Sequence, residues 1–94
     1  MNKKEFQEFV NKNSKEIENI RCQVSEVNLV EGERIFLDIF FTMNNSDKLV
    51  SIYESELYED NEENLGVLKI IAETWKTKIQ DWLVDIKIGD YILK

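Results

Sequence analysis

Residues 34–53 read RIFLDIFFTMNNSDKLVSIY, and this stretch decides the fold. Apolar residues occupy every second position of its first half, which is the period of a strand with one buried face. We expect that strand over 34–43. Its buried face consists of Ile35, Leu37, Ile39, Phe41 and Met43. Asn44-Asn45-Ser46-Asp47 has the composition of a turn, so the next strand, over 48–54, should fold back as a hairpin.

Two cross-strand pairs are expected in that hairpin. Phe41 should lie opposite Val50, because both are apolar and close to the turn. Ile39 should then lie opposite Ile52.

The preceding strand, expected over 22–30, joins the hairpin through a turn around Gly32. Its apolar residues change phase between Val24 and Val27, so they cannot all face one side of a regular strand. One extra residue near Ser25-Glu26, a β-bulge, would restore the phase. The expected pairs are then Leu29 with Ile35, Val27 with Leu37, and Val24 with Ile39.

Helical periodicity flanks the strands on both sides. Residues 2–21 begin with a capping box from Asn2 and Glu5. Asn13 lies on their apolar stripe, so either the helix breaks at Asn13-Ser14 and restarts with Ser14 as N-cap, or a buried Asn13 finds a partner. We expect the break, because Asn and Ser compete for backbone groups inside helices. The apolar stripe of residues 2–21 consists of Phe6, Phe9, Val10, Ile17 and Ile20. A second helix is expected over 61–82, capped by Asp60 with Glu63. Its stripe consists of Leu65, Leu68, Ile71, Ala72, Trp75, Ile79 and Trp82, and both tryptophans are assigned to the core.

A short C-terminal strand is expected over 84–88, before a turn at Gly89-Asp90. The fold class is therefore α+β: a three-stranded antiparallel meander packed against two helices, in the order α-β-β-β-α. The length of 94 residues is enough for a single domain over 1–94.

The composition excludes several kinds of site. The chain has no histidine, which excludes Ser-His and Cys-His nucleophile pairs. Cys22 is the only cysteine, so an internal disulfide and a Cys/His zinc site are also excluded. We expect no enzyme, no catalytic residue, no metal and no cofactor, and Cys22 is expected to be an inert core-facing side chain. With no signal-peptide pattern and no apolar run of about 20 residues, the expected localisation is cytoplasmic, with no membrane partner.

Negative charge is concentrated in one short segment. The chain has 12 basic and 19 acidic residues, and residues 54–63 (ESELYEDNEE) contain six acids and no base. One interpretation is a solvated loop that leads into an acidic first helical turn, where each acid stabilises by about 0.3–1 kcal/mol. The other is a docking surface for a protein partner with a basic surface. The candidate contact residues are Glu54, Glu56, Glu59, Asp60, Glu62 and Glu63.

The face of the sheet opposite the Ile35-Leu37-Ile39 face is a second candidate surface. It carries Phe36 and Phe40, which stay partly exposed if both helices cover the other face. Either the C-terminal residues Tyr91, Ile92 and Leu93 fold over it, or it is a dimer or partner surface.

The α-β-β-β-α order resembles the double-stranded-RNA-binding domain. That domain needs lysines at the start of its second helix to contact phosphates, and this chain has Glu62 and Glu63 there. The resemblance is therefore limited to topology, and direct nucleic-acid binding is not expected.

In size and charge the chain is similar to small acidic inhibitors, including immunity proteins and DNA mimics. We expect a non-enzymatic acidic module of that kind, which docks on a basic surface of a nucleic-acid-handling enzyme. The alternative is a small chaperone-like or structural module that forms a homodimer or binds a partner through the Phe36/Phe40 face.

Overall fold

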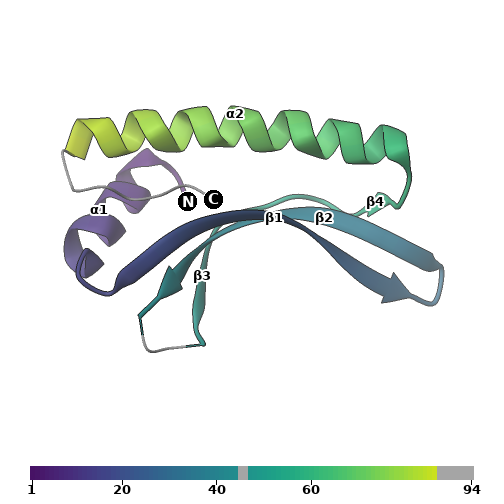
Figure 1. Cartoon of the computed structure of the whole chain (residues 1–94), viewed down its shortest axis with the longest axis horizontal. Helices are drawn as coiled ribbons and strands as arrows, with labels where there is room; N and C mark the ends of the chain where they lie inside the picture. Colours follow the sequence, from purple (N-terminus) through teal and green to yellow (C-terminus); the bar gives the residue numbers. More distant parts are fainter. Residues whose placement is uncertain (45–46, 87–94) are drawn as a thin grey trace.

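The computed structural model describes residues 1–44 and 47–86, without the side chains of residues 85 and 86. Its elements are α1 (Lys3–Asn13), β1 (Ile17–Leu29), β2 (Gly32–Met43), β3 (Leu49–Glu54), β4 (Tyr58–Glu59) and α2 (Glu62–Ile86). The strands form one antiparallel sheet in which β2 pairs with β1 on one side and with β3 and then β4 on the other. Figure 1 shows α2 lying along one face of this sheet. The α+β class is confirmed, and β4 is a strand that the sequence did not predict.

The core lies between the helices and one face of β2. The alternating residues of β2 are buried as predicted: Ile35, Leu37, Ile39 and Phe41 are each at most 2% exposed. Aromatic rings join the layers, since Phe6 of α1 lies 5.4 Å from Phe41 and 5.3 Å from Trp82, centroid to centroid. Trp75 and Trp82 pack against this core, which confirms their assignment.

The first helix is shorter than predicted. Its capping box is confirmed, because Asn2 and Glu5 exchange hydrogen bonds between side chain and backbone. The helix ends at Asn13, as the expected break requires, but the restart at Ser14 is wrong. Residues 14–16 form a turn, and Ile17 and Ile20 are buried in β1. A spacing of three residues fits one helical turn, and it also fits a strand that contains a bulge.

The bulge of β1 lies at Glu18, so the prediction of a bulge at Ser25-Glu26 is wrong. Ile17 pairs with Met43 and Asn19 with Thr42, and pairing is regular from there to Leu29. The three predicted pairs are replaced by Val24 with Leu37, Val27 with Arg34 and Leu29 with Gly32. This part of β1 extends beyond the core, since Val24 is 38% and Leu29 42% exposed. Because this part of β1 has no buried face, its apolar residues need not all lie on one side of the strand.

The two hairpins differ in how closely they follow prediction. The turn before Gly32 is confirmed, and Gly32 has a φ of 121°, a conformation that favours glycine. Phe41 pairs with Val50 as predicted. Ile39 pairs with Tyr53 and not with Ile52, because the register shifts at this point and Ile52 becomes the extra, buried residue of a second bulge.

The second helix is longer than predicted. It continues through residues 84–86, so the strand expected over 84–88 is wrong for its first three residues. An alternation of only three residues is too short to distinguish a strand from the end of a helix. Residues 87–94, with Gly89-Asp90 and Tyr91-Ile92-Leu93, lie outside the described residues. No helix in the described part of the chain has both the length and the apolar content needed to cross a bilayer.

Candidate protein-binding site

The backbone of the acidic segment, residues 54–63, is held along β2. Just after β3, the N–H of Ser55 donates to the carbonyl of Leu37 at 2.9 Å. The N–H of Leu37 donates in return to the Ser55 hydroxyl at 2.8 Å, and Ser55 is 9% exposed. Tyr58 and Glu59 then pair with Ile35 and Arg34 as β4. The acidic segment is therefore anchored to the sheet at two places.

The end of the acidic segment is fixed by the start of α2. The side-chain oxygen of Asn61 accepts a hydrogen bond of 2.8 Å from the backbone N–H of Asn64. The side-chain amide of Asn64 donates a hydrogen bond of 3.0 Å to the backbone carbonyl of Glu59. The predicted cap of Asp60 with Glu63 is therefore wrong by one residue. Asn and Asp are nearly equal as helix caps, so residue type alone could not choose between neighbours.

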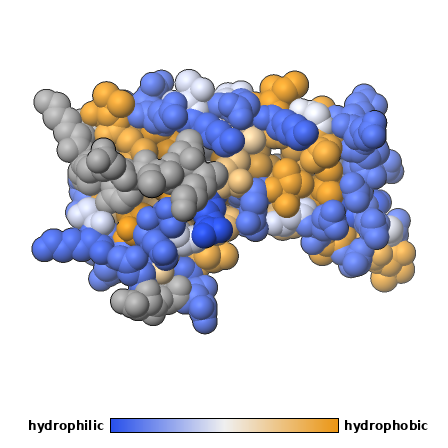
Figure 2. Space-filling model, viewed as in Figure 1, coloured by the Kyte–Doolittle hydropathy of each residue, from blue (hydrophilic) through white to orange (hydrophobic). Residues whose placement is uncertain are grey.

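All six candidate acids are exposed. None takes part in an ion pair among residues 1–44 and 47–86. Figure 2 shows hydrophilic residues gathered at the end of the molecule where β4 and the first turn of α2 lie. Glu62 and Glu63 are in that first turn, where the positive end of the helix dipole stabilises them. Glu54, Glu56 and Glu59 precede the helix.

The strand register places Phe36 among these carboxylates. On the sheet face away from the helices, Asp38 lies opposite Glu54, and Arg34 lies opposite Glu59. Phe36 is on the same face of β2, between Asp38 and Arg34, because alternate residues share a face. Its side chain is partly buried. The structure thus joins the two candidate surfaces into one, the acidic aromatic face, which consists of Phe36, Asp38, Glu54 and Glu59.

Asp38 is the electrostatically strained member of the acidic aromatic face. Burial raises the pKa of Asp38, and the neighbouring Glu54 carboxylate raises it further. Like charges directly opposite each other on two strands are unfavourable. A cationic group docked between Asp38 and Glu54 would relieve this repulsion.

Phe40 is two residues beyond Asp38 on the same sheet face, but it is buried and adds little to the acidic aromatic face. It lies opposite Ser51 and Arg21 and is only 4% exposed, so the expectation that it is partly exposed is wrong. Phe36 does keep a partly exposed side chain, as expected. The suggested cover by Tyr91, Ile92 and Leu93 falls outside the described residues. Phe40 therefore offers little area to a partner.

The groups that the acidic aromatic face exposes are carboxylates and one aromatic ring. Among the described residues, no three His, Cys, Asp or Glu side chains are grouped so that they could hold a metal ion. Cys22 is partly buried, and burial raises the pKa of its thiol while the Lys76 charge lowers it. A thiol with a raised pKa is a weak nucleophile at neutral pH. Exposed carboxylates around an aromatic ring can instead bind cationic side chains.

Two residues of this region were not assigned to a candidate site from the sequence. Asp38 is the single charge among residues 35–43 of β2, and that interruption of an apolar run was a usable signal. Leu57, in the middle of the acidic segment, is 50% exposed, and the acids around it were a usable signal of that exposure.

Comparison of the chain with protein-family models, with curated proteins and with solved structures found no match.

Proposed function

We propose that this protein is a non-enzymatic binding module that docks on a basic surface of another protein through its acidic aromatic face. The observation that most supports this is the position of Phe36 between Glu54 and Glu59 on one face of the sheet. Protein interfaces combine an apolar centre with a charged rim, and aromatic residues are enriched among their strongest contacts. Glu56, Asp60, Glu62 and Glu63 extend the rim along the acidic segment.

The proposed partner is a protein that handles nucleic acid, which this module would inhibit or neutralise as an immunity protein does. Surfaces that bind nucleic acid carry clustered Lys and Arg side chains. An Arg guanidinium can stack on an aromatic ring and can also pair with a carboxylate through two hydrogen bonds. Phe36 with Glu54 or Glu59 presents both kinds of group side by side. A chaperone-like or structural role through the Phe36/Phe40 face has less support, because Phe40 is buried.

Charge removal at matched positions tests this proposal. The segment variant carries Glu54→Gln, Glu56→Gln and Glu59→Gln. The control variant carries Glu8→Gln, Glu16→Gln and Glu31→Gln, three exposed acids elsewhere on the molecule. Both variants have the same net charge, so a difference between them reports on location. Each protein is immobilised and exposed to a lysate of its source cells at about 50 mM salt, where screening is weak.

We expect the wild type and the control variant to retain the same basic, nucleic-acid-handling protein, and the segment variant to lose it. Retention of the same set of proteins by all three baits would contradict the proposal. Loss from both variants alike would contradict it too, since net charge and not the acidic aromatic face would then govern binding.

A further inference from the structure

A groove of about 370 Å³ lies between β1 and α2, on the side of the sheet that faces the helices. Small residues line it on both sides, Cys22 from β1 and Ala72 from α2, so strand and helix leave space between them. Leu37 of β2, which is only 1% exposed, lies at its base. The volume is within the range of about 300–1,000 Å³ that small-molecule sites occupy.

Much of the lining of this groove is apolar. Val24 is on the same face of β1 as Cys22, because alternate residues share a face, and it is 38% exposed. The apolar lining appears as a hydrophobic area between α2 and the sheet in Figure 2. An apolar group that covered Val24 would remove its own surface and that of Val24 from water, which is favourable.

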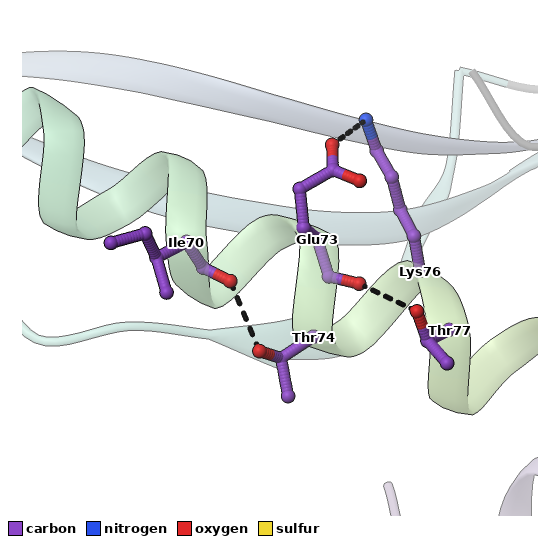
Figure 3. Close-up of polar contacts among 5 residues, drawn as sticks. All are labelled: Ile70, Glu73, Thr74, Lys76 and Thr77. Atoms are coloured by element: carbon purple, nitrogen blue, oxygen red, sulfur yellow. Dashed lines mark hydrogen bonds and ion pairs between the residues drawn. The ribbon is translucent and has the colours of Figure 1, made fainter.

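The rim of the groove on α2 carries two lysines. Lys69 and Lys76 are seven residues apart, close to two helical turns, so they lie on one side of α2 and about 10 Å apart along its axis. Glu73, between them, forms an ion pair of 3.4 Å with Lys76, and Figure 3 shows both side chains extending from α2 toward β1. The Thr74 and Thr77 hydroxyls, also drawn there, donate to carbonyls one turn earlier and do not line the groove. Lys69 forms no ion pair with any residue in 1–44 or 47–86.

The charges of the groove indicate the kind of ligand that it fits. Its basic rim contrasts with the net charge of −7 of the whole chain. A carboxylate can pair with the ammonium group of Lys69, whereas a cationic ligand would be repelled by it. A doubly charged anion such as a phosphate would be opposed more strongly than a single carboxylate by the negative field of the molecule. The groove is therefore complementary to a singly charged anion with an apolar chain.

We propose that this groove binds a medium-chain carboxylate, with its chain against Val24, Leu37 and Ala72 and its carboxylate at Lys69. This site goes beyond the proposed function and does not depend on it. The groove is on the side of the sheet that faces the helices, and the acidic aromatic face is on the other side. Both can therefore be occupied at the same time.

Cys22 provides a direct measure of occupancy. It is the only cysteine and it lines the groove, so a ligand bound there should shield its thiol. The rate of alkylation by the neutral reagent iodoacetamide is followed by mass spectrometry, while octanoate is titrated below its micelle concentration. We expect the rate to fall as octanoate is added and to reach a plateau. Octanol should protect the thiol less at equal concentration, because it has no charge to pair with Lys69.

Four variants locate the ligand. Ala72→Leu fills the groove and should abolish the protection, and Val24→Ser, a change at a partly exposed position, should weaken binding of both octanoate and octanol. Lys69→Gln should weaken octanoate binding by about two- to fivefold, as the loss of an exposed ion pair does, and should leave octanol binding unchanged. Lys4→Gln, the matched control, removes an exposed lysine of α1 and should bind octanoate as wild type does. Circular dichroism confirms that each variant is folded.

Several results would overturn the proposal. Octanoate that gives no protection, or that protects wild type, Ala72→Leu and Val24→Ser equally, would not be bound in this groove. Octanol that protects as strongly as octanoate would show that the carboxylate contributes nothing. Equal weakening by Lys69→Gln and Lys4→Gln would show that net charge, and not the position of Lys69, governs binding.

Discussion

Ser55 fills the place of a strand residue although it lies between β3 and β4. Its backbone and its hydroxyl satisfy both the carbonyl and the N–H of Leu37, a residue that is 1% exposed. Without them, two buried polar groups of the central strand would have no partner here. Together with β4, Ser55 therefore keeps the acidic segment in register with β2.

Ser55→Ala should lower the free energy of unfolding by about 1–3 kcal/mol, because the buried N–H of Leu37 loses its acceptor. Urea denaturation measures the loss. Ser51→Ala, an exposed change on β3, should stay within about 0.5 kcal/mol of wild type. Equal midpoints for the two variants would show that the hydroxyl of Ser55 is not needed.

The Asp38–Glu54 pair predicts a pH dependence of stability. Burial and Glu54 raise the pKa of Asp38 in the folded state, so the folded protein binds this proton more tightly than the unfolded chain does. The contribution of Asp38 is therefore favourable at low pH, and it is lost as the pH rises through the pKa of the folded state. Glu54→Gln removes the carboxylate that, together with burial, raises the pKa of Asp38.

We expect Glu54→Gln to raise the free energy of unfolding near neutral pH by about 0.2–1 kcal/mol, the range for like charges on paired strands. The gain should shrink in acid, where Asp38 is protonated in both proteins. Glu56→Gln, which has no such partner, should give no gain. Urea unfolding of all three proteins at several pH values checks this, and a gain that grows in acid would contradict it.

Among the helices and strands, the sequence predicted correctly the features that a long hydrophobic period encodes. The buried face of β2 and the stripe of α2 are long regular patterns, and both are confirmed. The errors occur where an element or a bulge involves only one or two residues, or where tertiary packing decides the structure. β4 has only two residues, the bulges at Glu18 and Ile52 each involve one, and the outer part of β1 has no buried face. The start of α2 was missed by one residue because Asp60 and Asn61 are chemically alike as caps.

A pair of alanine variants distinguishes Asn61 from Asp60 as the N-terminal cap of α2. Asn61→Ala should lower the free energy of unfolding by about 0.5–2 kcal/mol, because the N–H of Asn64 loses its acceptor. Asp60→Ala should change it by less than about 0.5 kcal/mol, since Asp60 is exposed and lies outside the helix. Thermal or urea unfolding measures both, and a larger loss for Asp60→Ala would reverse the assignment.

At the scale of the whole molecule, the candidate site comes from an arrangement that the sequence did not show. The six acids were recognised from composition, and Phe36 from its place on the second sheet face. That they lie together depends on Ser55 and β4, which set the path of the acidic segment along β2. Phe40 was assigned to the same surface from alternation alone, and its burial could not be read from the sequence.

Phe36 should contribute to partner binding in a way that salt does not alter. Phe36→Ala is expected to weaken binding by about fivefold or more at both low and high salt, because the lost contact is apolar. Leu49→Ala is the control, an exposed apolar residue on β3 away from Phe36. Calorimetric titration against the captured protein measures both, after circular dichroism confirms that each variant is folded. Equal affinities for the two variants would remove Phe36 from the interface.

The most direct measurement is the dissociation constant of the complex with the captured basic protein, at about 50 mM and about 500 mM salt. Wild type should bind more weakly as salt rises. The segment variant (Glu54→Gln, Glu56→Gln, Glu59→Gln) should bind weakly at low salt and lose little more at high salt, because the charges that are screened are the ones removed. The control variant (Glu8→Gln, Glu16→Gln, Glu31→Gln) should follow wild type. A segment variant with wild-type affinity at low salt would contradict the account.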